Sequence, residues 1–246
     1  MLYNISRLLM FDCFPFLKHA LNLAANSQGF VNLDFESANL APSPPNQVKY
    51  VPIASALPGW TASAGSAPIN QVMQNSFDFG TANVSILGPN YPAAGPQSQA
   101  DSAVGTLDGH YTVLLQAGGG INPNGDPTTV NTSISQTGTI PFGYKSIEFK
   151  AWQSYSTFSV SFDGNTLPLV PIDLTANYNI YGVDISAYAG QTGPLDFTAI
   201  FGSGLSLVEL DDITFSTQAV PEPSPLILTG FGGLIFLLRR RLVANR

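Results

Sequence analysis

Few residues in the body of the chain could carry catalysis. Residues 28–218 contain one histidine, His110, and neither cysteine nor arginine. Nucleophilic catalysis needs a base beside its nucleophile, and no Gly-x-Ser-x-Gly or His-Glu-x-x-His motif accompanies His110. The absence of these motifs favours the interpretation of His110 as an ordinary rim residue at the start of a strand. A pair of carboxylates could serve as glycosidase acid and base, but fourteen acidic residues supply the pool, and the sequence singles out no pair.

Aromatic side chains offer a different chemistry, because their flat faces stack on sugar rings. Trp152 shares the strand parity of Lys150. It is therefore predicted to stand on the outer face of its strand while Phe149 points inward. We predict Trp152 and the nearby Tyr155 as ligand contacts. The alternative is that Trp152 and Trp60 are core or loop-anchoring residues.

The charge of the body excludes nucleic acid as a partner. Residues 28–218 hold three basic and fourteen acidic residues, a net charge of about −11. Affinity for nucleic acid comes largely from Lys and Arg side chains that contact phosphates. A surface with this negative charge repels the phosphate groups instead. The one cysteine, Cys13, lies outside this region, so neither a disulfide nor a thiolate metal site can form within it.

The elements that must position these residues are strands. Period-two alternation recurs along the body, separated by stretches rich in Pro, Gly and Asn. The predicted strands are residues 30–36, 84–86, 111–115, 147–149, 158–162, 166–172, 181–185, 195–201 and 206–215. Asp163-Gly164-Asn165 is the predicted turn of a hairpin, and Gly118-Gly119-Gly120 a predicted flexible turn. About nine or ten short strands in one domain predict an all-β, antiparallel two-sheet sandwich of the jelly-roll type.

The C-terminal stretch combines three features in a fixed order. They are the segment Val220, Pro221, Glu222, Pro223 and Ser224, an apolar run from Pro225 to Leu238, and the cluster Arg239, Arg240 and Arg241. The prolines forbid a helix across the first segment and keep it extended. The apolar run predicts a single transmembrane helix, short at about 21 Å against a hydrocarbon core of about 30 Å. The arginines favour the cytoplasmic side.

This order of parts resembles the PEP-CTERM sorting signal of Gram-negative surface proteins. In that family the signal holds an exported protein in the inner membrane until an exosortase-type transpeptidase cuts near the motif. The resemblance makes Val220 to Ser224 the recognition segment and Arg239 to Arg241 the membrane stop. It implies an exosortase-type processing enzyme and, transiently, the inner membrane as partners.

Export requires a signal at the other end of the chain as well. Arg7 precedes an apolar stretch at residues 8–11, and Ala25-Asn26-Ser27 has small residues at the two positions that a signal peptidase reads. Asp12, Lys18 and His19 interrupt the apolar region, which makes the signal atypical. We predict a signal peptide over residues 1–27, a β-sandwich domain over 28–218 and a sorting and anchor segment over 219–246.

Three short segments resemble galactose-binding-like jelly rolls, whose best-known members are carbohydrate-binding modules. The segments are Phe30 to Glu36, Leu57-Pro58-Gly59-Trp60 and Leu210 to Phe215. In such a sandwich the first and last strands lie side by side, which crowds their carboxylates. The family commonly resolves this with a structural calcium ion. The resemblance places that ion on Glu36 and Asp212, with Asp34 and Asp211 as secondary candidates. The alternative is ordinary exposed carboxylates.

These features predict an exported bacterial protein, anchored in the inner membrane and then delivered to the cell surface or extracellular matrix. Its predicted role is structural or adhesive, with binding of extracellular polysaccharide and no catalysis. The alternative is a carbohydrate-active, glycosidase-like enzyme on the same β-sandwich. Hydrolysis of a glycan panel separates them, because a binder retains glycans without cleaving them.

Overall fold

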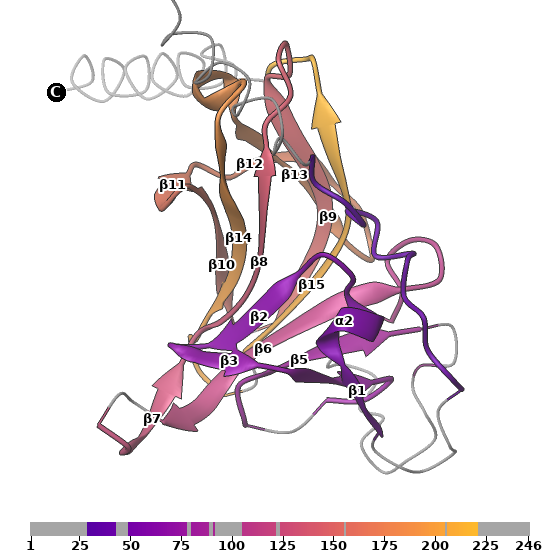
Figure 1. Cartoon of the computed structure of the whole chain (residues 1–246), viewed down its shortest axis with the longest axis vertical. Coiled ribbons are helices and arrows are strands. Elements are labelled where there is room, and N and C mark those ends of the chain that lie inside the picture. The colour runs from indigo at the N-terminus through magenta and orange to yellow at the C-terminus, as the bar shows by residue number, and fades with distance from the viewer. Residues whose placement is uncertain are drawn as a thin grey trace, which may run out of the picture.

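The fold is an all-β sandwich of two sheets (Figure 1). The computed structural model describes residues 29–42, 49–77, 80–88, 91, 105–121, 124–154, 156–204 and 206–220. In this part of the chain a nine-stranded sheet has the order β1-β4-β5-β6-β15-β9-β13-β12, with β7 paired to β6. The second sheet has six strands in the order β11-β10-β14-β8-β2-β3. The predicted two-sheet sandwich is confirmed.

The nine-stranded sheet consists of β1 (Lys49–Pro52), β4 (Gln71–Gln74), β5 (Asn83–Leu87), β6 (Thr112–Ile121), β7 (Pro127–Val130), β9 (Ser146–Ser154), β12 (Val170–Leu174), β13 (Asn179–Asp184) and β15 (Ser206–Ser216). The six-stranded sheet consists of β2 (Thr61–Ala64), β3 (Ala67–Ile69), β8 (Thr132–Thr139), β10 (Thr157–Phe162), β11 (Asn165–Leu167) and β14 (Thr192–Ile200). Two short helices, α2 (Ile53–Ala56) and the 3-10 turn η1 (Ser186–Tyr188), join strands. The named strands pair antiparallel except β4 with β5.

The core lies between the sheets, where alternate residues of each strand point inward. Phe149 on β9 packs edge-on against Phe197 on β14, with ring centroids 5.2 Å apart. Trp60, just before β2, is 3% exposed and lies between Phe35 and Phe197. Its indole Nε1 donates a hydrogen bond to the Asn32 carbonyl at 3.0 Å. Trp60 is therefore a core residue that also anchors the N-terminal segment, as the alternative interpretation of the tryptophans supposed.

The segment predicted as the first strand is a turn instead. Asn32 and Phe35 have φ of 51° and 57°, outside the strand region. Asn32 Oδ1 accepts the Ser37 N–H at 2.9 Å and Asp34 Oδ1 accepts the Glu36 N–H at 3.3 Å. These local hydrogen bonds compete with the hydrogen bonds of a sheet. The strand predicted from the alternating pattern of residues 30–36 is therefore wrong. Phe35 is fully buried, whereas Val31, predicted on the same face, is 42% exposed.

The glycine run predicted as a flexible turn is part of strand β6. Gly118, Gly119 and Gly120 pair with β7. A Cβ at Gly118 would lie 2.6 Å from the Gly80 carbonyl oxygen, so glycine is required by a close approach of backbone rather than by a turn. The hairpin prediction at residues 163–165 is confirmed, because Phe162 pairs with Asn165 across Asp163 and Gly164, both with positive φ.

The strand predicted over residues 166–172 is divided between the sheets. Its first part belongs to β11, and its second part begins β12 in the opposite sheet. The structure also contains strands that the sequence reading missed, including β8, which alternates Thr, Ile and Ser. Each of the other predicted strands overlaps an observed one and extends beyond it by at most one residue, at Tyr111, Ile185 or Phe201.

Candidate functional site

The four predicted metal ligands lie together beside β15, a central strand of the nine-stranded sheet. Asp34, Glu36, Asp211 and Asp212 line one pocket of about 250 Å³, together with Asp108 and Gly109. Their predicted proximity is confirmed even though residues 30–36 form no strand. Asp108, which the sequence reading did not select, is the fifth carboxylate.

Contacts between the N-terminal segment and β15 form this pocket. The Ile213 N–H donates to the Leu33 carbonyl at 3.0 Å, and Phe30 stacks on Phe215 with centroids 5.4 Å apart. The pairing of β15 with β9 shifts register between Asp211 and Thr214. Asp212 lies within this irregularity, with φ of 49°. A bulge of this kind bends its strand and changes the direction of its side chains.

Backbone N–H groups hold the Glu36 carboxylate from the loop before β6. Its Oε1 accepts hydrogen bonds from His110 N at 2.7 Å and from Tyr111 N at 2.9 Å. Its Oε2 lies 3.3 Å from His110 Nδ1. The His110 side chain is 76% exposed, at the rim of the pocket. Glu36 thus links the N-terminal segment to the 105–112 loop.

Lys150 on β9 places a positive charge among these carboxylates. It lies opposite Asp211 in the β9–β15 register. Its ammonium forms ion pairs with Asp108 and with Asp212, the latter at 2.9 Å. Partial burial alone would lower the pKa of Lys150, but hydrogen bonds to both aspartates raise it above its ordinary value. The hydrogen bond from Lys150 and one from the Gly109 N–H lower the pKa of Asp108.

Asp211 is the buried member of the cluster, with 1% of its surface exposed. Desolvation raises its pKa to about 7, although hydrogen bonds to its carboxylate act in the opposite direction. These bonds come from the Thr112 hydroxyl, from Asp108 N at 3.1 Å and from Asp212 N at 2.8 Å. The negative charge of Asp108 adds a smaller upward shift.

This arrangement does not fit a calcium ion. Calcium takes six to eight oxygen ligands at about 2.3–2.6 Å. Here the oxygens of Glu36 and Asp211 accept hydrogen bonds from the chain, and the Lys150 ammonium bridges Asp108 and Asp212. Among the described residues, no three His, Cys, Asp or Glu side chains are placed to hold a metal. Calcium binding stays a prediction from the resemblance.

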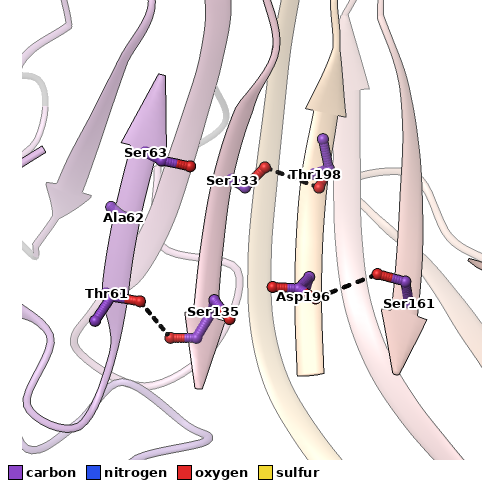
Figure 2. A pocket seen from close by; sticks show the side chains of 8 residues that line it. All are labelled: Thr61, Ala62, Ser63, Ser133, Ser135, Ser161, Asp196 and Thr198. Atoms are coloured by element: carbon purple, nitrogen blue, oxygen red, sulfur yellow. Dashed lines mark hydrogen bonds between the residues drawn. The ribbon is translucent and has the colours of Figure 1, made fainter. Parts of the chain in front are cut away.

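A second candidate site is a polar groove on the outer face of the six-stranded sheet (Figure 2). It measures about 320 Å³ and is lined by Thr61, Ala62, Ser63, Ser133, Ser135, Ser161, Asp196 and Thr198. We call it the hydroxyl groove. The register places its side chains in two rows across neighbouring strands. One row runs Thr61, Ser135, Asp196, Ser161 and the other Ser63, Ser133, Thr198, Ser159.

Hydrogen bonds along these rows orient the groove. Figure 2 shows the Thr61 hydroxyl donating to the Ser135 carbonyl at 3.1 Å and the Ser161 hydroxyl donating to Asp196 at 3.3 Å. The hydroxyls of Ser133 and Thr198 lie 2.9 Å apart. Each hydroxyl carries one donor and two acceptor lone pairs, which leaves capacity for a polar ligand. The sequence signal for this site was the alternation of Ser and Thr with apolar residues in β8 and β10.

Trp152 lies on the outer face of the other sheet. Phe149 and Ala151 point into the core, as predicted, whereas Trp152 is half-buried against a second apolar cluster. That cluster contains Phe77, Leu87, Leu114 and Leu207, with Tyr91 beside it. Packing against this cluster explains the presence of a tryptophan at position 152. The cluster lies on the other sheet from the hydroxyl groove. Its predicted ligand contact remains a prediction, and Tyr155 lies outside the described residues.

The sorting motif begins where the described chain ends. Val220 is the last described residue, whereas Pro221 to Ser224, the predicted transmembrane helix and Arg239 to Arg241 lie outside the described residues, as does the predicted signal peptide. Thr217, Gln218 and Ala219 are exposed after β15. Within the described part of the chain, no helix combines the length and apolar character needed to cross a membrane.

Comparison with known proteins shows similarity in fold to carbohydrate-binding modules. No family model and no curated protein matches the chain. The module TmCBM61, solved with β-1,4-galactotriose, is 13% identical with a TM-score of 0.40, covering 76% of this chain and 95% of the module. A family 11 module from Clostridium thermocellum, solved with a mixed-linked tetrasaccharide, is 9% identical with a TM-score of 0.33, covering 71% and 98%.

An enzyme domain is similar at the same level. Tailspike protein 4 of bacteriophage CBA120 is 17% identical with a TM-score of 0.34, covering 65% of this chain and 19% of that structure. TM-scores below 0.5 and identities below 25% establish no correspondence between residues. The likeness concerns the two-sheet β-sandwich alone.

Proposed function

We propose that this protein is an exported bacterial surface or extracellular-matrix protein that binds polysaccharide and has a structural or adhesive role. The observation that carries the binding proposal is the hydroxyl groove, an open face with two rows of hydrogen-bonding side chains. Sugar hydroxyls both donate and accept, so they match Ser and Thr hydroxyls that do the same.

The groove favours a neutral polysaccharide. Among its lining residues, Asp196 is the one ionisable side chain, and none is Lys or Arg. A polyanionic glycan would meet a carboxylate without a cation to balance it, and the excess of acidic residues in the body adds repulsion. Selection of a neutral glycan therefore follows from the charge of both the groove and its surroundings.

The groove does not favour the glycosidase alternative. Glycosidases commonly use two carboxyl groups, roughly 5–9.5 Å apart, flanking the scissile bond. The groove contributes Asp196 alone. The pocket lined by Asp34, Glu36, Asp108, Asp211 and Asp212, which we call the acidic pocket, lies on the other sheet. Binding without cleavage is therefore the function that this face supports.

The binding test compares two variants on a panel of neutral and acidic polysaccharides. In the groove variant, Thr61, Ser135 and Ser161 are replaced by Ala, and in the control variant Thr128 on β7 is replaced by Ala. Thr128 is an exposed hydroxyl outside the groove. Each hydrogen bond contributes roughly 1 kcal/mol, so the groove variant should bind about 100-fold more weakly and the control as the wild type.

Affinity electrophoresis and assay of released reducing ends read out this test. Equal binding by all proteins would remove the groove from the proposal. No binding to any glycan would remove polysaccharide binding itself. Release of reducing ends would favour the glycosidase alternative.

The sorting part of the proposal rests on the tail sequence and on the exposed residues that precede it. A processing enzyme can read Val220 to Ser224 only if the segment stands clear of the folded body, and residues 217–219 are exposed. Replacing Pro221 and Pro223 by Ala should leave the protein uncut and membrane-bound. Cell fractionation with mass spectrometry of the C-terminus measures this. Wild-type protein on the surface with Arg246 still attached would contradict exosortase-type sorting.

A further inference from the structure

We propose that Lys150 is an internal cation that takes the place of a bound metal in the acidic pocket. The N-terminal segment would then dock on β15 without calcium. This lysine acts on the stability of the fold and not on polysaccharide binding, because the hydroxyl groove lies on the other sheet.

The position of Lys150 follows from the strand register. Lys150 on β9 pairs with Asp211 on β15, on the outer face of the sheet. From there its ammonium reaches Asp108, from the loop before β6, and Asp212, from the irregular part of β15 at 2.9 Å. The Lys150 side chain is 16% exposed, whereas the Asp108 and Asp212 side chains are 54% and 39% exposed, so water screens these pairs in part. One lysine therefore joins two segments that are distant in sequence.

The remaining carboxylates of the pocket have donors from the chain. Glu36 accepts the N–H groups of His110 and Tyr111. Asp211 accepts the Thr112 hydroxyl and two N–H groups. Asp34 accepts the Glu36 N–H. A cation is thus needed chiefly between Asp108 and Asp212, where Lys150 already lies.

Removing the Lys150 ammonium should destabilise the protein and make its stability depend on an added cation. Lys150→Met keeps much of the apolar stem and leaves Asp108 and Asp212 facing each other without a positive charge. The melting temperature should fall by about 2–4 °C, because ion pairs to partly exposed carboxylates contribute modestly to stability. Calcium should restore part of the loss, since the two carboxylates could then bind the ion.

The experiment measures thermal unfolding of the full chain in detergent by tryptophan fluorescence, in EDTA and in millimolar calcium. Wild type should melt at the same temperature in both. Lys150→Arg, which keeps the charge, should stay close to wild type and calcium-independent. Lys145→Met is the matched control, because Lys145 is exposed before β9 and its loss removes the same charge elsewhere.

Two outcomes would overturn the proposal. One is a wild-type melting temperature that rises with calcium, which would support the metal predicted from the resemblance. The other is a Lys150→Met protein that melts with the Lys145→Met control. Should Lys150→Met fail to fold, Asp108→Asn and Asp212→Asn provide milder tests. Each should weaken the lysine contact without creating a calcium response.

Discussion

The outer faces of the two sheets have opposite characters. On the nine-stranded sheet, the outward residues Leu114 and Leu207 are fully buried, and so is Glu209, which pairs with Leu114. On the six-stranded sheet, the outward residues Ser133, Ser135 and their neighbours line an open groove. The first face is a second small core, whereas the second is a solvated surface.

A third layer of chain explains the difference. Phe77 and Tyr91 pack on the outer face of the nine-stranded sheet. The loop before β6 donates hydrogen bonds to the central strand β15, from Gly105 N to Glu209 and from Asp108 N to Asp211. No described segment covers the hydroxyl groove in the same way. A sheet face covered by distant loops thus serves stability, whereas an uncovered face of the same sandwich is available for binding.

The largest effect should come from the covered face. Leu114→Ala removes a fully buried side chain and should cost about 2–5 kcal/mol in the free energy of unfolding. The matched change on the open face, Ser133→Ala, should stay within about 0.5 kcal/mol. Chemical denaturation of both variants measures these values. Similar losses for the two would mean that the faces do not differ as described.

A pH effect of similar or smaller size should come from Asp211. Its folded-state pKa of about 7 lies above the ordinary 3.8, so between these values the folded state holds a proton that the unfolded state has lost. The free energy of unfolding should therefore fall as the pH rises from about 4 to 7, by at most about 1.4 kcal/mol per pH unit, and should level off above pH 7. The pKa of Asp108 is lowered, so its contribution to the free energy of unfolding is lost as the pH falls below about 4, outside this range.

Denaturation at several pH values, in a chelator, measures this dependence. Asp211→Asn should flatten it, since the amide does not titrate. A variant with the same slope as wild type would show that Asp211 is not the group responsible. Asp196→Asn on the open face is the control for the loss of a carboxylate elsewhere in the fold.

The smallest effect concerns Trp152 and decides which face meets the ligand. Trp152→Ala loses packing against the Leu114 and Leu207 cluster, and we expect a cost of about 1–2 kcal/mol because the ring is only half-buried. Affinity for polysaccharide should not change if the hydroxyl groove is the site. Loss of binding in a folded Trp152→Ala protein would instead support the sequence-based prediction of Trp152 as a ligand contact.

Much of the fold could be predicted because strand alternation is local. The alternation in 147–149 and 158–162 identified strands β9 and β10, and it correctly placed Phe149 inward and Trp152 outward. Alternation failed at residues 30–36, where side chains of Asn32 and Asp34 bond the backbone and form a turn. It also gave no warning that β6 and β15 are buried on both faces.

By itself, the sequence determined the all-β class, the acidic character of the body and the order of parts in the tail, because each depends on composition or on near neighbours. Only the tertiary structure decided what surrounds the carboxylates. Lys150 and Asp108 are 42 residues apart, and register and loop docking bring them together. Likewise, the Ser and Thr of β2, β8, β10 and β14 become one groove only when strand pairing aligns them. Pairing between distant segments brings these side chains together, and it cannot be predicted from local sequence patterns.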